Sequence, residues 1–114
     1  MKSTKVLRKS DGKTVADPCW LADGFFNRFR GLMGRASLAS GEGLLLKPCN
    51  SIHTFFMRFA IDVVYLDSEG KVLKIRRNFK PWRADLPVFG AKSVLEVSAG
   101  SLGEIREGDQ LCLS

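Results

Sequence analysis

From residue 42 onward, the apolar residues fall into short runs that turn-forming residues separate. Clear examples are residues 43–46, 61–66 and 93–97, each too short for an ordinary helix and each followed closely by Pro, Gly, Ser or Asp. Residues 67–70, Asp-Ser-Glu-Gly, have typical turn chemistry. This pattern predicts short strands joined by turns, and therefore a mainly β fold.

Two earlier strands are predicted at about residues 4–9 and 13–21. Asp11 and Gly12 lie between them, and an Asp-Gly pair between short apolar segments is a strong hairpin signal. With the later runs this gives about seven to nine short strands, which favours a small antiparallel β-barrel or sandwich. No repeat or linker divides the chain, so we expect residues 1–114 to form a single domain.

One α-helix is predicted at about residues 24–33. Asp23 is a suitable N-cap, and Gly34 suits the position just after the helix. The apolar positions recur at helical spacing and form one face: Phe25, Phe26, Phe29, Leu32 and Met33. We expect this helix to cover one opening of the barrel or sandwich.

The composition excludes several classes of protein. A hydrophobic content of 45% and a charged content of 26% are ordinary for a globular chain and argue against disorder. No apolar run approaches the roughly 18 residues of a membrane span, and no apolar segment follows the basic N-terminus. We therefore expect neither a membrane partner nor a signal peptide.

Three cysteines without a paired spacing fit a reducing compartment, which predicts a cytoplasmic protein.

The net charge of +6 is concentrated in residues 71–83, which hold six basic residues and no acid. Phe79 and Trp82 lie in the same segment. Basic and aromatic residues together can bind nucleic acid through phosphate contacts and base stacking. Alternate basic residues on a strand are also typical of a solvated face or a protected edge. Nucleic acid is thus one candidate partner, though not the favoured one.

Asp62 is a charged residue within the otherwise apolar run 61–66. An unpaired carboxylate in a core costs several kcal/mol, so we expect a partner, with Arg30 and Arg58 as candidates. The residue is then either half of a structural ion pair or a pocket carboxylate with a shifted pKa.

His53 is the only histidine, and it lies in a predicted strand over residues 52–57. One residue of register decides whether it meets Asp62. If Met57 pairs with Ile61, His53 and Asp62 lie on opposite faces. If Met57 pairs with Asp62, they share one face. The sequence leaves both registers open.

Residues 80–83, Lys-Pro-Trp-Arg, read as a loop. Trp82 and Arg83 are candidates for the rim of a pocket, and the alternative for Trp82 is a lid over the core. Glu96 alternates with apolar residues in a predicted strand. If its side chain points inward, it is a partner for Arg30 or Arg83.

Cys49 precedes His53 by four residues, which makes the two a candidate nucleophile and base. In a strand such residues lie about 13 Å apart, so the pair would need the chain to turn back between them. The ordinary alternative for Cys49 is an inert buried thiol.

The chain lacks the paired spacings of zinc sites and the phosphate-loop, serine-hydrolase and dinucleotide motifs. We therefore expect no metal and no cofactor.

Several segments, taken in order, resemble the blocks of domain-of-unknown-function family 192 (DUF192), also called UPF0127. They are RFRGLMGR (28–35), PCNSIHTFFMRFAIDVVYLD (48–67), KPWR (80–83), VLEVSAG (94–100) and EGDQL (107–111). The resemblance covers about residues 15–113, and Ala60 and Ser98 replace prolines that are usual in the family. It implies a compact, mainly β fold with one helix and no assigned activity. It also points to motif positions: Arg30, His53, Met57, Asp62 and Glu96.

From these observations we expect a small-molecule-binding domain that holds a sugar or small anion in a polar pocket. The predicted pocket residues are Arg30, His53, Met57, Asp62, Trp82, Arg83 and Glu96. Two alternatives stay open. One is a small hydrolase-like enzyme with His53 as general base and Asp62 as its orienting group. The other is a nucleic-acid-binding module that uses residues 71–83.

Overall fold

The computed structural model describes residues 2–22, 24 and 32–114, and within these it contains strands and no helix. The predicted mainly β fold is therefore confirmed. The strands are β1 (Ser3–Arg8), β2 (Thr14–Ala22), β3 (Gly43–Leu46), β4 (Ile61–Leu66), β5 (Val72–Phe79), β6 (Ser93–Ser98) and β7 (Leu111–Leu113).

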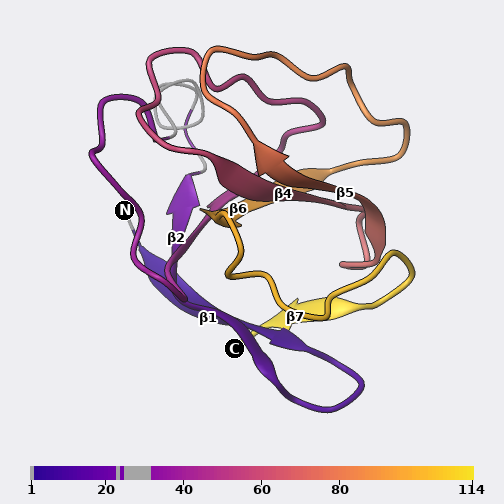
Figure 1. Ribbon diagram of the computed structural model, residues 1–114. Coiled ribbons are helices and arrows are strands. Elements are labelled where there is room, and N and C mark those ends of the chain that lie inside the picture. The colour runs from indigo at the N-terminus through magenta and orange to yellow at the C-terminus, as the bar shows by residue number, and fades with distance from the viewer. Residues whose placement is uncertain (1, 23, 25–31) are drawn as a thin grey trace.

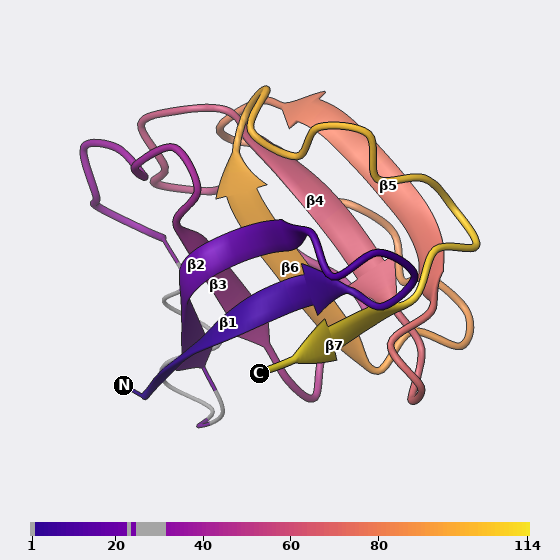
Figure 2. The same cartoon turned by 90° about the horizontal axis from the view of Figure 1, so that it is seen from below.

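All the strands belong to one 7-stranded sheet with the order β5-β4-β6-β3-β2-β1-β7. The sheet curls until its two edge strands approach each other, as Figures 1 and 2 show. An isolated bridge between Lys71 and Gln110 joins the two edges at one end. Two backbone hydrogen bonds of 2.8 Å strengthen this contact, from Val72 N to Asp109 O and from Leu111 N to Gly70 O. The architecture is a curled half-barrel.

The sheet is mixed rather than wholly antiparallel. Strands β2 and β3 run parallel, with Trp20 opposite Leu44, whereas every other neighbouring pair is antiparallel. A parallel pair needs a long crossover connection, and residues 23–42 provide it. The sequence pattern shows strands but not their directions, so this exception was missed.

The hairpin predicted around Asp11-Gly12 is confirmed, because β1 and β2 pair antiparallel with Leu7 opposite Thr14. The helix predicted over residues 24–33 falls largely on residues 25–31, outside the described part of the chain. Residues 32–34, at its predicted C-terminal end, form a turn.

The strand predicted over residues 52–57 is wrong. This segment is a loop whose backbone bonds to the loop after β5, with Thr54 N donating to Arg83 O and Asp85 N donating to Ile52 O. Strand β4 is already paired on both sides, with β5 and β6. Neither register considered for Met57 therefore occurs.

The curled sheet separates two hydrophobic cores. The inner core fills the hollow of the half-barrel and receives side chains from every strand; it includes Val6, Val15, Cys19, Leu45, Val64, Val72, Leu95 and Leu111. The outer core lies between the convex face and the loops that cover it; it includes Leu44, Leu46, Ile52, Met57, Ile61, Val63, Tyr65 and Val94. Strand β4 contributes to both cores, which explains why its sequence is apolar almost throughout.

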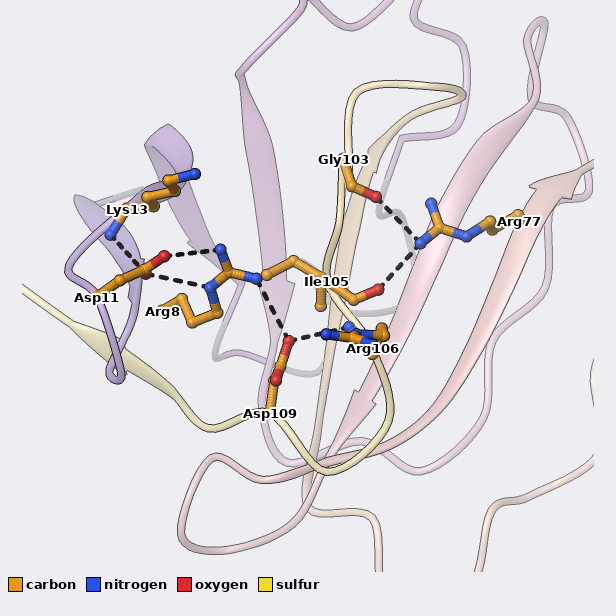
Figure 3. A network of polar contacts seen from close by, with 8 residues as sticks. All are labelled: Arg8, Asp11, Lys13, Arg77, Gly103, Ile105, Arg106 and Asp109. Carbon is orange, nitrogen blue, oxygen red and sulfur yellow. Dashed lines mark hydrogen bonds and ion pairs between the residues drawn. The ribbon is translucent and has the colours of Figure 1, made fainter.

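A network of arginines ties the segment between β6 and β7 across the open side of the half-barrel (Figure 3). The Arg77 guanidinium on β5 donates to the carbonyl oxygens of Gly103 at 3.1 Å and Ile105 at 3.0 Å. At the other end, Arg8 on β1 forms an ion pair of 3.6 Å with Asp109. A hollow of about 620 Å³ lies beside these residues. Since Arg8 and Arg77 bind groups of the protein itself, we interpret the network as part of the closure of the sheet.

Candidate functional site

The loop before β4 and the loop after β5 are held together by Thr54, which is fully buried. Its hydroxyl donates to Lys80 O at 2.6 Å and accepts from Arg83 N at 3.0 Å. Its backbone N–H donates to Arg83 O at 2.7 Å, and its carbonyl accepts from Trp82 N at 2.9 Å. One residue therefore fixes the conformation of residues 80–83. In Figure 1 both loops lie at the end of the molecule away from β1 and β7.

These two loops carry an exposed cluster of rings, formed by Phe55, Phe56 and Trp82, which we call the aromatic surface. Phe56 is 58% exposed, Trp82 59% and Phe55 40%. The ring centroids of Phe56 and Trp82 lie 4.8 Å apart, and those of Phe55 and Trp82 lie 6.3 Å apart. His53 stacks on Phe55, with their ring centroids 5.2 Å apart. Trp82 is thus not a lid over the core.

The backbone that holds two of these rings is strained. Phe56 has φ of 65° and Trp82 has φ of 64°, a region that side chains other than glycine rarely occupy. Each such residue costs about 1–3 kcal/mol, so surrounding contacts must hold it in place. For Trp82 the contact is the bond to Thr54, and for Phe56 it is a 3.0 Å hydrogen bond from Gly34 N to its carbonyl. Two exposed aromatic residues therefore have backbone conformations that neighbouring parts of the chain must stabilise.

The two loops that carry the aromatic surface also carry exposed basic residues. Arg58, Lys80 and Arg83 are all exposed, and the ion pairs between described residues involve none of them. The nearby acid, Asp85, is engaged elsewhere. A ligand on this surface would therefore meet apolar rings with cations at their edge.

Asp85 anchors the loop after β5 to the outer face of the sheet. Its carboxylate accepts hydrogen bonds from Tyr65 Oη at 2.8 Å and from Arg76 Nε at 3.0 Å. Burial opposes ionisation of Asp85, but the bonds from Arg76 and Tyr65 outweigh it and lower the pKa of the carboxyl. The loop is therefore pinned near its middle as well as at Thr54.

Asp62 is buried on the inner face of β4, where its carboxylate accepts two backbone hydrogen bonds. Asn78 N donates at 2.9 Å and Gly100 N donates at 3.0 Å. A partner for this charge was predicted, but the partners found are the backbone amides of Asn78 on β5 and of Gly100 in the turn after β6, rather than Arg58. Arg30, the other predicted partner, lies outside the described residues. Asp62 thus holds three strands in position.

His53 lies over the outer face of the sheet, because its neighbours Ile52 and Met57 pack in the outer core. Its Nδ1 accepts a hydrogen bond from Phe55 N at 3.2 Å. The sheet therefore separates His53 from Asp62, and the structure does not bring these two predicted residues together. It does bring His53 and Trp82 together, through Phe55. Met57 is buried in the outer core rather than at a surface.

Glu96 is buried on the outer face of β6 and lies in one row across the sheet. Its register neighbours are Leu44 and Val63, and beyond them lie Trp20 and Arg76. Burial raises the pKa of the Glu96 carboxyl to about 8, so the protonated form predominates at neutral pH. Arg83, a predicted partner, lies exposed on its loop, and Arg30 is outside the described residues. Glu96 therefore belongs to the layer beneath the loops.

The basic segment 71–83 does not form a single basic face. Arg76 points to the outer side, where it bonds to Asp85, whereas Arg77 bonds to carbonyl oxygens of the segment between β6 and β7. Phe79 packs against the outer core. Lys80, Trp82 and Arg83, at the end of the segment, lie exposed on the loop after β5.

Three further observations concern the Cys49 thiol, possible metal ligands and membrane-length helices. The Cys49 thiol is half-buried and donates to Ser51 O at 2.9 Å. Residues 2–22, 24 and 32–114 contain no cluster of three or more metal-ligating side chains. In the same part of the chain there is no helix of the length and apolarity that a membrane crossing requires.

Sequence reasoning missed Thr54 and the exposure of Phe55 and Phe56. The two phenylalanines were assigned to a strand, where they would have alternated between core and solvent. Thr54 had no sequence signal, because its role depends on carbonyl and amide groups of a loop distant in the chain.

The fold and the site together define a class: a small domain built on a curled mainly β sheet, with an exposed aromatic surface carried by two neighbouring loops. The chain belongs to the DUF192 family, described as uncharacterized ACR, whose model matches residues 6–113. A UPF0127 protein of Thermococcus sibiricus is 35% identical over 112 residues, covering 93% of this chain and 72% of the relative. UPF0127 protein PF1050 of Pyrococcus furiosus is 34% identical over 111 residues, covering 93% and 95% of the two chains.

The same fold occurs in a solved structure, that of a protein of unknown function from Novosphingobium aromaticivorans. It superimposes with a TM-score of 0.80 at 24% identity, covering 96% of this chain and 83% of the other. This similarity shows the shared fold.

Proposed function

We propose that this protein binds a small carbohydrate on its aromatic surface. The observation that carries the proposal is the contact between Phe56 and Trp82, two large rings that are both more than half exposed. Both residues have left-handed backbone conformations, which hydrogen bonds to Thr54 and Gly34 hold in place. An exposed apolar patch that is maintained against strain is typical of a binding site.

A sugar fits this surface for two chemical reasons. One face of a sugar ring is lined by C–H groups and packs well against aromatic side chains, which commonly line ligand sites. The hydroxyl groups at the ring edge need hydrogen-bond partners, and the exposed Lys80 and Arg83 supply donors. Because both donors are cationic, we expect acidic sugars to bind more tightly than neutral ones.

The proposed site therefore differs from the polar pocket expected from the sequence. It keeps His53, Trp82 and Arg83, and it adds other residues of the two loops: Phe55, Phe56 and Lys80. It leaves out Asp62, Met57 and Glu96, since all three are buried. Arg30 lies outside the described residues.

A fluorescence titration tests this proposal. Trp20→Phe leaves Trp82 as the sole tryptophan, because the chain has only two. We expect saturable changes with an oligogalacturonate and weaker ones with a neutral gluco-oligosaccharide of equal length. In calorimetry, Trp82→Ala should bind at least about tenfold more weakly. Leu113→Ala, which alters an exposed leucine on β7, should bind normally. No response up to about 10 mM sugar, or full binding by Trp82→Ala, would overturn the proposal.

Single-stranded nucleic acid is the second candidate ligand, because exposed rings beside cations also stack bases. The engagement of Arg76 and Arg77 within the protein argues against an extended basic groove. Titration with an oligothymidylate of fifteen or so nucleotides distinguishes the two ligands. Tight binding that weakens steeply with salt, without any response to sugars, would favour nucleic acid.

The hydrolase alternative has less support, because His53 and Asp62 lie on opposite sides of the sheet.

The proposed location is the cytoplasm. Its support is that Cys19, Cys49 and Cys112, all within the described residues, form no disulfide.

A further inference from the structure

Two apolar side chains project from the loop between β5 and β6 without packing on either core. Leu86 is 80% exposed and Phe89 is fully exposed. Large side chains with this much exposure are unusual when several occur on one loop, and they mark contact surfaces. We call residues 86–89 the apolar tip.

The backbone of the apolar tip is fixed, so the exposure is built into the fold. Leu86 N donates to the Asp85 carboxylate at 3.0 Å. Val88 N donates to Asn50 O at 2.8 Å, and the Val88 side chain packs against the outer core. Leu86 and Phe89 are thus directed outward from either side of an anchored residue.

The loop that carries the apolar tip is positively charged. The same loop carries Lys80, Arg83 and Lys92, all exposed. Its one acid, Asp85, is bound to Arg76 by two hydrogen bonds of 3.0 and 3.2 Å. Figure 1 shows this loop running along the outside of the molecule, at the end away from β1 and β7.

We propose that the apolar tip inserts into the surface of an anionic lipid bilayer. Leu86 and Phe89 would enter the boundary between headgroups and acyl chains, and the three cations would lie against the headgroups. Aromatic and aliphatic side chains flanked by Lys and Arg bind membrane interfaces by this combination of burial and charge. The sequence predicted no membrane partner, but that expectation concerned spanning segments. This contact is peripheral.

The charges favour a bilayer over a second copy of the chain. Two copies meeting through the apolar tip would bring together two sets of like charges, which opposes association. An anionic lipid surface is instead complementary to the loop.

Co-sedimentation with lipid vesicles tests the proposal. We expect the full chain to bind vesicles of phosphatidylcholine and phosphatidylglycerol at about millimolar lipid and low salt. It should not bind pure phosphatidylcholine, and added salt should release it. Leu86→Ser and Phe89→Ser should each weaken binding by about tenfold. Leu113→Ser is the matched control, because Leu113 is exposed on β7, and it should leave binding unchanged.

Charge-reversal variants test the electrostatic contribution to vesicle binding. Arg83→Glu should weaken vesicle binding by about tenfold, whereas Lys13→Glu, at the β1–β2 hairpin, should have little effect. Equal binding by wild type and Phe89→Ser would overturn the proposal, as would a lack of binding to anionic vesicles. If the wild-type chain self-associates but does not bind lipid, and Phe89→Ser abolishes the self-association, then the apolar tip contacts a second copy of the chain instead of a bilayer. Neither Leu86 nor Phe89 belongs to the aromatic surface, so sugar binding by these variants tests the proposed function separately.

Discussion

The rings of Phe56 and Trp82 lie 4.8 Å apart although their loops precede β4 and follow β5, and both residues have left-handed backbone conformations. Neither loop could hold this arrangement alone. Thr54 connects them, since it bonds to the backbone on both sides of Trp82. The aromatic surface is therefore a product of tertiary structure, and its integrity depends on a buried hydroxyl group.

Thr54→Val should release Trp82 and destabilise the chain. Valine keeps the shape of threonine but leaves the Lys80 carbonyl and the Arg83 amide without their bonds to the hydroxyl, which costs about 1–3 kcal/mol. In a Trp20→Phe background, acrylamide should quench Trp82 more strongly. Thr54→Ser retains the hydroxyl and should behave closer to wild type. Unchanged quenching and stability in Thr54→Val would show that Thr54 does not position Trp82.

Asp62→Asn should lower the free energy of unfolding by about 2–3 kcal/mol. The carboxylate accepts from Asn78 N and Gly100 N in a buried site, and an amide side chain can satisfy only one of these donors well. Asp67 is a matched control, because it also accepts two backbone hydrogen bonds, but in a turn. Denaturant unfolding should show a clearly smaller loss for Asp67→Asn. Similar losses at both positions would contradict the structural role given to Asp62.

Glu96 should make stability depend on pH. In the folded chain the pKa of its carboxyl is about 8, against 4.5 for the ordinary group, so the folded state binds more protons than the unfolded state between these values. Stability from this group should therefore fall as pH rises from about 4.5 to about 8, by a total on the order of a few kcal/mol. Denaturant unfolding measured across this range should show the decrease.

Glu96→Gln is the control for that pH dependence, since glutamine is similar in shape and stays neutral. The variant should lose most of the decrease and should exceed the wild-type protein in stability at pH 8. A wild-type protein whose stability rises over the same interval, with Glu96→Gln following it in parallel, would contradict the buried neutral carboxyl.

Gly70→Ala should disrupt the closure of the half-barrel. Gly70 has φ of +82°, and an added Cβ would collide with the backbone carbonyl of Leu111 on β7. Gly12 in the β1–β2 hairpin has a similar φ of +72° but open space around it. Gly12→Ala should therefore cost about 1 kcal/mol from backbone conformation alone. Gly70→Ala should cost several kcal/mol more in thermal or denaturant unfolding, and equal losses would argue against a tight contact at this corner.

Much of the fold could be predicted because local patterns determine it. Asp11-Gly12 marks the first hairpin, and the continuous apolar run 61–66 marks a strand buried on both faces. The segment 52–57 was misread because Ile52 and Thr54 are buried on either side of the half-buried His53, a spacing that resembles strand alternation. The parallel pairing of β2 with β3 has no local signal, since it depends on the path of the crossover.

The candidate site was predicted only in part, for a related reason. The loop character of Trp82 follows from the adjacent proline, and the need for a partner at Asp62 follows from its apolar surroundings. The sequence does not identify that partner. A carboxylate can accept hydrogen bonds either from an arginine or from backbone amides that are distant in the chain, and Asp62 does the latter. Thr54 was missed for the same reason.

If ligands bind on the aromatic surface, a nuclear magnetic resonance titration should locate the binding there directly. The indole N–H resonances of Trp20 and Trp82 report on two separate places, because Trp20 Nε1 is already bound to Glu42 at 2.7 Å. With an oligogalacturonate, we predict a saturable shift of the Trp82 indole and of the amides of Phe55 and Phe56, while the Trp20 indole stays still. Shifts confined to Trp20 and its surroundings, or none at saturating sugar, would contradict the account.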